Sequence, residues 1–136
     1  MALPIEAAAR TALEAEGVGT AEISVSLLDD PAIAGLHERY LGVHGPTDVL
    51  SFNLDAEGAA GGSPEGLLGD IYIGFETAAS HAEDRGIGLK EELTRLTIHG
   101  VLHILGHDHP SDEGREGSPM YLRQEELLRL FLDKRS

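Results

Sequence analysis

Residues 99–109 (HGVLHILGHDH) constrain the fold and the chemistry of this chain more than any other segment. His99 and His103 are four residues apart in a run with the pattern of a helix, so both imidazoles lie on one helix face, about 5–6 Å apart at Cβ. Gly106 is a typical helix stop, because glycine adopts the left-handed conformation without steric cost. Beyond that turn the chain can swing back and bring His109 to the same ion. We therefore expect a helix followed by a returning loop.

Three protein nitrogens with an open fourth position are typical of a catalytic zinc site, whereas structural zinc sites usually have four protein ligands. We therefore predict one Zn²⁺ per chain, held by His99, His103 and His109. Nickel, copper or iron would also accept nitrogen ligands. The plainer interpretation, ordinary polar residues near a helix end, suits a single histidine better than three at this spacing.

The histidine spacing matches the zinc metalloprotease pattern H-E-x-x-H-x-x-G-x-x-H at every position but one. Gly100 stands where that pattern has glutamate, the general base that deprotonates the metal-bound water during peptide hydrolysis. A metal alone still lowers the pKa of its bound water to about 7. The sequence thus argues against a peptidase and leaves other metal-dependent hydrolysis open.

The composition predicts one hydrophobic core without disulfides. The chain has 136 residues, of which 41% are hydrophobic, and no cysteine. Its net charge is −14, with ten Lys plus Arg against 24 Asp plus Glu, so no basic stripe is obvious. Charge alone therefore argues against a polyanionic substrate. A divalent metal and a local arginine could still offset the field at one cleft, because charges beyond about 8–10 Å are largely screened.

The N-terminal 17 residues contain charged side chains at four positions and no continuous apolar segment: Glu6, Arg10, Glu14 and Glu16. We therefore expect no secretory signal. No stretch of the sequence approaches the length of a membrane span. The expected location is the cytoplasm, with no membrane partner.

The order of the expected elements indicates an α+β fold. Strands are expected at 21–28, 47–54 and 69–75, and helices over 4–16, 30–41, 76–84, 89–105 and 120–132. Asp30 is the candidate cap of the second helix, with Pro31 at its first position. The composition of residues 55–68 predicts a flexible loop, and that of residues 110–119 predicts a polar loop. Strands and helices do not alternate strictly, so we expect one domain over 1–136, a small mixed sheet packed with helices.

Three motifs make the chain resemble the YbeY family of bacterial rRNA maturation factors. They are the histidine stretch 99–109, the strand 46–52 (PTDVLSF) and residues 68–71 (LGDI). Glu91-Glu92 ahead of the histidine helix and Glu125-Glu126 in the last helix fit as well. The resemblance covers nearly the whole chain. It implies a fold like that of zinc proteases with a metal-bearing helix, the three histidine ligands, and a single-strand-specific endoribonuclease. It also implies roles in ribosomal RNA processing and small-subunit quality control.

The chain departs from the family pattern at two positions. Many members have an arginine five residues before the proline of the PTDVLSF strand, where this chain has Leu41. Arg39 and Arg95 are candidates to replace that guanidinium, although an exposed, solvated arginine is the plainer interpretation of each. Asn53 stands where the family commonly has proline, and we expect only a local effect on the strand.

Several other polar residues have a structural and a functional interpretation. Asp108 is a tentative catalytic residue that could orient a ligand imidazole or manage the proton of the water, or it caps the turn after Gly106. His107 is not expected to be a ligand, and Asp48 and Ser51 could contact substrate. The remaining residues are expected to have structural roles or surface positions: Asp70 stabilises a loop, Met120 starts a buried helix face, and His37, His44 and His81 lie at the surface.

Two hypotheses of different classes follow. The first is a zinc-dependent endoribonuclease that acts on single-stranded rRNA, in 16S rRNA 3′ end processing, with an arginine sharing the transition-state charge. The second is a weakly catalytic or non-catalytic ribosome-assembly factor that the metal stabilises and that docks on small-subunit proteins, which the acidic surface and Leu41 motivate.

Overall fold

The computed structural model describes residues 5–18, 22–53, 67–105 and 118–135. Over these ranges the helices are α1 (Ile5–Ala15), α2 (Asp30–Leu41), α3 (Phe75–Arg85), α4 (Leu89–Ile104) and α5 (Pro119–Arg135). The strands are β1 (Glu22–Leu28), β2 (Val49–Asn53) and β3 (Leu67–Gly74). The α+β class and the small mixed sheet packed with helices are therefore confirmed.

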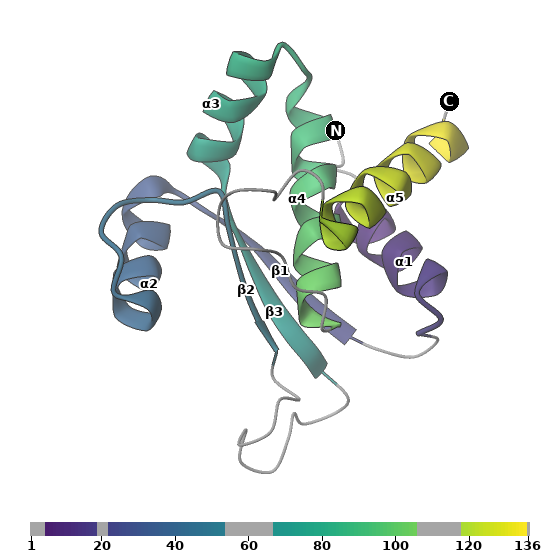
Figure 1. Ribbon diagram of the computed structural model, residues 1–136. Helices are drawn as coiled ribbons and strands as arrows, with labels where there is room; N and C mark the ends of the chain where they lie inside the picture. The colour runs from purple at the N-terminus through teal and green to yellow at the C-terminus, as the bar shows by residue number, and fades with distance from the viewer. Residues whose placement is uncertain (1–4, 19–21, 54–66, 106–117, 136) are drawn as a thin grey trace.

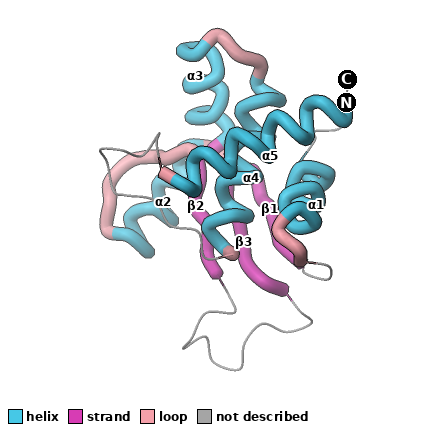
Figure 2. Tube along the Cα trace, turned by 45° about the vertical axis from the view of Figure 1, so that its right-hand side comes forward, coloured by secondary structure: helices cyan, strands magenta, loops and turns pink. Residues whose placement is uncertain are grey.

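The three strands form one mixed sheet in the order β1-β3-β2 (Figures 1 and 2). β3 is central, parallel to β1 and antiparallel to β2. Ser51 of β2 and Val25 of β1 both pair with Ile71, so these three side chains share the sheet face toward α4. The opposite face carries Tyr72 and lies toward α2.

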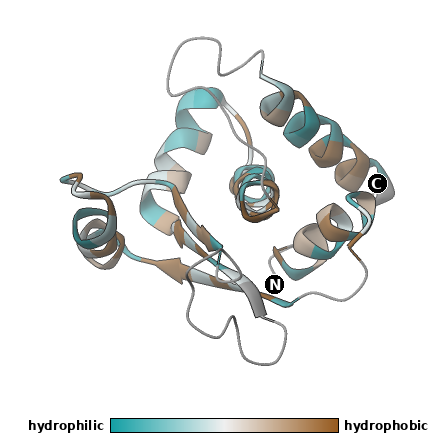
Figure 3. Ribbon diagram, turned by 60° about the horizontal axis from the view of Figure 1, so that its bottom comes forward, coloured by the Kyte–Doolittle hydropathy of each residue, from teal (hydrophilic) through white to brown (hydrophobic). Residues whose placement is uncertain are grey.

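Helix α4 occupies the centre of the molecule, with α1, α5, α3 and the sheet around it (Figure 3). Ten of its sixteen residues are buried, including Leu93, Ile98 and Leu102, which belong to one hydrophobic cluster with residues of α1, β3 and α5. Since α4 is apolar on several sides, it is a core helix rather than a surface helix. Among the described helices, none is both long and apolar enough to cross a membrane.

Most element boundaries agree with the expectation within about two residues. The predicted cap of α2 is wrong: the capping side chain is that of Asp29, which accepts a hydrogen bond from Ala32 N at 3.0 Å. Asp30 is instead the first helical residue, and its carboxylate accepts a hydrogen bond from Thr77 Oγ1. Either of the two adjacent aspartates could cap α2. The bond from Thr77 of α3 occupies the carboxylate of Asp30, and Asp29 is the cap.

Two further boundaries differ from the expectation. β3 begins at Leu67, so the loop expected over 55–68 ends before it, and residues 54–66 lie outside the described ranges. Pro119, expected in a loop, opens α5, where its missing N–H costs no helical hydrogen bond. The hydrophobic cluster joins α1, β3, α4 and α5. That residues 1–136 form one domain stays a prediction.

Gly100 is a point of close approach between α4 and β3. A Cβ built at this position would lie 2.7 Å from Ile71 Cδ1 and 2.9 Å from Ile71 Cγ1. Ile71 is fully buried, so its side chain has little room to move away. The position that a metalloprotease fills with its glutamate is thus closed here by packing.

We predict that Gly100→Ala lowers the free energy of unfolding by about 1–3 kcal/mol, because the added methyl group overpacks the core. Gly35→Ala in α2 is the matched control, since nothing lies within 4 Å of a Cβ there. The control should leave the stability unchanged or raise it by up to about 1 kcal/mol. Urea unfolding of both variants gives the comparison, and equal stabilities would contradict the close approach.

Candidate functional site

A cavity of about 520 Å³ opens beside α4. It is bounded by the residues that precede and begin β2, by α3 and the α3–α4 turn, and by the first turns of α5. Its polar lining comes from several segments of the sequence: Asp48, His81, Arg85, Glu92, Arg95, His99, Tyr121 and Gln124. The cavity therefore joins one candidate zinc ligand, His99, to a second group of charged side chains.

The side chain of His99 is held by Gln124 of α5. His99 Nδ1 lies 2.7 Å from Gln124 Oε1, and Gln124 Nε2 donates to Glu125 Oε2 at 3.0 Å. The second bond fixes the amide so that its oxygen faces the imidazole. Because that oxygen can only accept, Nδ1 of a neutral His99 carries the proton and the lone pair lies on Nε2. This is the tautomer that a metal ligand with a fixed orientation needs.

His103, one turn further along α4, is exposed and contacts the edge strand β2. Its Nδ1 lies 3.0 Å from Ser51 Oγ. Asn53 Nδ2 donates to the Ile104 carbonyl at 2.7 Å, at the end of the same helix. Two side chains of β2, both on the α4 face, thus fix this end of α4 and one candidate ligand. The contact of Ser51 with substrate that the sequence suggested stays a prediction.

The structure describes two of the three predicted zinc ligands. His99 and His103 are both on α4, in the (i, i+4) relation that the sequence predicts. His109 and the tentative residue Asp108 lie outside the described residues, as do His107 and Gly106. The three-histidine ligand set therefore stays a prediction.

Arg95 is not the exposed, solvated arginine that was the plainer expectation. Its side chain is only 15% exposed, and it donates to Glu125 at 2.9 and 3.2 Å and to Glu92 at 3.0 Å. Burial lowers the pKa of Arg95, but the bonds with Glu125 and Glu92 outweigh it and hold the pKa above its ordinary value. Burial raises the pKa of Glu125, yet its bonds with Arg95 and Gln124 leave that pKa lowered. Both groups are therefore charged at neutral pH.

The other candidate guanidinium, Arg39, is exposed as expected. It lies over the ring of Tyr40, 5.3 Å from the centroid, near the end of α2. Leu41, at the position where many family members have arginine, is 58% exposed. The catalytic roles suggested for Arg39 and Arg95 both stay predictions, although Arg95 is already bound by glutamates.

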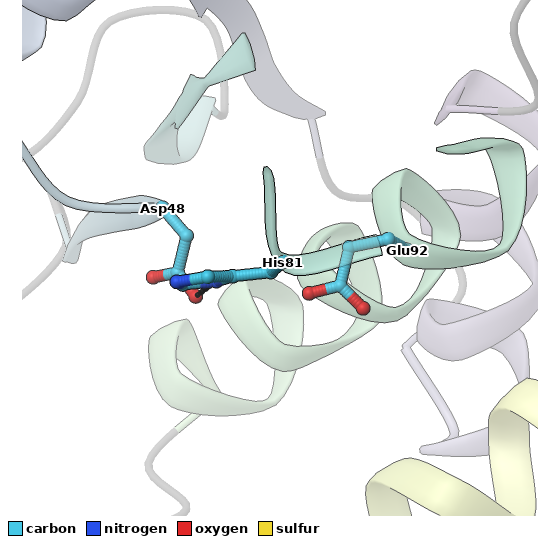
Figure 4. A group of neighbouring side chains, drawn as sticks. All are labelled: Asp48, His81 and Glu92. Carbon is cyan, nitrogen blue, oxygen red and sulfur yellow. Dashed lines mark ion pairs between the residues drawn. The ribbon is translucent and has the colours of Figure 1, made fainter. Parts of the chain in front are cut away.

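A second group of metal-binding side chains was not anticipated from the sequence. Within the described part of the chain, Asp48, His81 and Glu92 place one ligand atom each within 4.8 Å of one another (Figure 4). This group could hold a metal ion. His81 was expected at the surface, but its Nδ1 is buried. Because the three residues come from different segments, no spacing in the sequence indicates them.

These features define a class: an α+β domain whose central helix carries two histidines one turn apart, one bound to the last helix and the other to an edge strand. Residues 3–131 match the family described as Endoribonuclease YbeY, so the chain belongs to the YbeY family of endoribonucleases. The resemblance inferred from the sequence is confirmed.

Individual relatives cover most of the chain. Endoribonuclease YbeY of Pelotomaculum thermopropionicum is 45% identical over 89% of this chain and 80% of its own length. The protein of the same name from Moorella thermoacetica is 46% identical over 88% and 79%. A Thermotoga maritima protein with a known solution structure shares the fold, with a TM-score of 0.63, 24% identity and coverage of 96% of this chain and 82% of that one.

We predict that Arg95→Met lowers the free energy of unfolding by about 3 kcal/mol, because it leaves the buried Glu92 carboxylate with Arg85 as its remaining arginine partner. Arg39→Met, at an exposed arginine, is the matched control and should change stability by less than about 1 kcal/mol. Thermal and urea unfolding measure both. A stable Arg95→Met variant would contradict the structural role assigned to this arginine.

Proposed function

We propose that this endoribonuclease is zinc-dependent and acts on single-stranded ribosomal RNA, in 16S rRNA 3′ end processing and small-subunit quality control. The observation that carries the proposal is the pair of α4 histidines, each held through Nδ1 by a neighbouring element, in a chain of the YbeY family. His99, His103 and His109 would hold the ion. The relatives' name, an endoribonuclease, favours this over a non-catalytic assembly factor.

A zinc ion held by three imidazoles would act as a Lewis acid on a phosphate oxygen or activate a water molecule. The chain's own contribution is orientation. Gln124 holds His99 in the tautomer with its lone pair on Nε2, and Ser51 positions His103 on the exposed side of α4. Gly100 offers no general base between the two histidines, so the base of the peptidases is missing.

The acidic composition limits how RNA can bind. The net charge is −14, and the guanidinium of Arg95 is engaged by glutamates. We infer that the metal and contacts with unpaired bases, rather than a basic stripe, hold the substrate. Unpaired bases can be splayed out and contacted individually, which suits a single-stranded substrate.

The test is cleavage of a single-stranded RNA that spans the 3′ end of precursor 16S rRNA. The wild type should cut it, lose activity with a chelator and regain it with Zn²⁺. His103→Ala should bind one zinc per chain fewer than the wild type and cut at least about a hundredfold more slowly. His44→Gln, at an exposed histidine, is the control and should behave as wild type. Undiminished cleavage by His103→Ala would overturn the proposal.

A further inference from the structure

Three side chains that line the cavity come from separate segments and lie beside one another (Figure 4). Asp48 precedes β2, His81 lies on α3, and Glu92 lies in the first turn of α4. Their ligand atoms lie within 4.8 Å of one another, and the side chains range from 39% exposed for His81 to fully buried for Glu92. One imidazole nitrogen and two carboxylates are a donor set that zinc and other borderline divalent metals accept.

His81 is the unusual member of this group. Its Nδ1 atom is buried and makes no hydrogen bond with any described residue. Asp48 Oδ2 lies 3.4 Å from it, within ion-pair distance but without a hydrogen bond. A buried polar atom without a partner is costly and requires an explanation. A cation between the imidazole and the two carboxylates would satisfy it.

The charges around the group leave an excess of negative charge. Four carboxylates belong to the connected set (Asp48, Glu91, Glu92 and Glu125), against the guanidiniums of Arg85 and Arg95. With His81 neutral, two negative charges are uncompensated within the set. One divalent cation would neutralise them in a partly buried place, where screening by solvent is weak.

We propose that Asp48, His81 and Glu92 form a second metal site, separate from the histidine site, which takes a divalent transition-metal ion of the Zn²⁺ or Mn²⁺ type. Glu92 and His99 are seven residues apart on α4, which corresponds to about 10 Å along the helix axis. The two metals of a two-metal phosphodiesterase lie about 3.5–4 Å apart. The second ion is therefore not a partner of the first in the chemical step. It joins the start of β2 to α3 and α4.

Arg85 is the competitor of this ion. Its Nη1 lies 3.0 and 3.2 Å from the two oxygens of Glu92, so the guanidinium supplies the positive charge when no metal is bound. The Arg85 side chain is 54% exposed and can move into solvent, whereas Arg95 is 15% exposed and remains on Glu92. Removing Arg85 should therefore tighten metal binding.

The experiment measures Zn²⁺ binding by calorimetry, with metal analysis after dialysis, on the full chain in the His103→Ala background, which removes the histidine site. This variant should still bind one Zn²⁺ per chain. Adding His81→Gln should weaken binding at least about a hundredfold, and adding Arg85→Gln should tighten it about threefold to fivefold. Adding His44→Gln, at an exposed histidine, should have no effect. Circular dichroism establishes that each variant is folded.

No binding by folded His103→Ala would overturn the second site, as would unchanged binding after His81→Gln. Neither result depends on RNA cleavage, so failure of this site and failure of the proposed function are distinguishable. In the wild type, two zinc ions per chain should fall to one with His81→Gln alone, and cleavage should persist. A wild type that binds a single ion insensitive to His81→Gln would also contradict the proposal.

Discussion

The contact between Gly100 and Ile71 lets α4 lie close against the sheet. A single added carbon at Gly100 would overlap the buried Ile71 side chain. Because the helix lies this near, Ser51 and Asn53 of the edge strand reach His103 and the Ile104 carbonyl directly. The glycine thus serves the fold and the site together: it permits the packing that holds His103, and it removes the glutamate that peptide hydrolysis requires.

Charge is the second constraint, because a chain of net charge −14 buries Glu92 completely and Glu125 in part. Glu92 is completely buried and is compensated by Arg85 and Arg95, and Arg95 also binds Glu125. Breaking such a pair costs several kcal/mol, since an uncompensated charge would remain inside the protein. The same network reaches the histidine site, because Glu125 accepts the hydrogen bond from Gln124 that orients its amide toward His99. The stability of the protein and the orientation of His99 therefore depend on one set of contacts.

The parts that could be predicted from the sequence rest on local periodicity. The helix of His99 and His103 follows from apolar residues at helical spacing. The strands follow from the alternation of apolar and polar residues, and the α+β class follows from the order of these elements. The bonds of Gln124 with His99 and of Arg95 with Glu125 could not be found this way, nor could the group of Asp48, His81 and Glu92, because these contacts join residues that are distant in the chain. The predicted cap of α2 is wrong for a different reason: Asp29 and Asp30 are adjacent and chemically equal, and their contacts with α3 and with Ala32 distinguish them. The positions of Asp108 and His109 lie outside the described residues.

The central claim is that α4 and its two supporting side chains present the Nε2 atoms of His99 and His103 to one ion. The most direct measurement is a crystal structure of the zinc-loaded protein with anomalous scattering at the zinc edge. We predict an anomalous peak about 2.0–2.1 Å from Nε2 of both residues, with Gln124 and Ser51 still bound to the Nδ1 atoms. A peak bonded to Nδ1 of either histidine, or no peak at these residues, would contradict it.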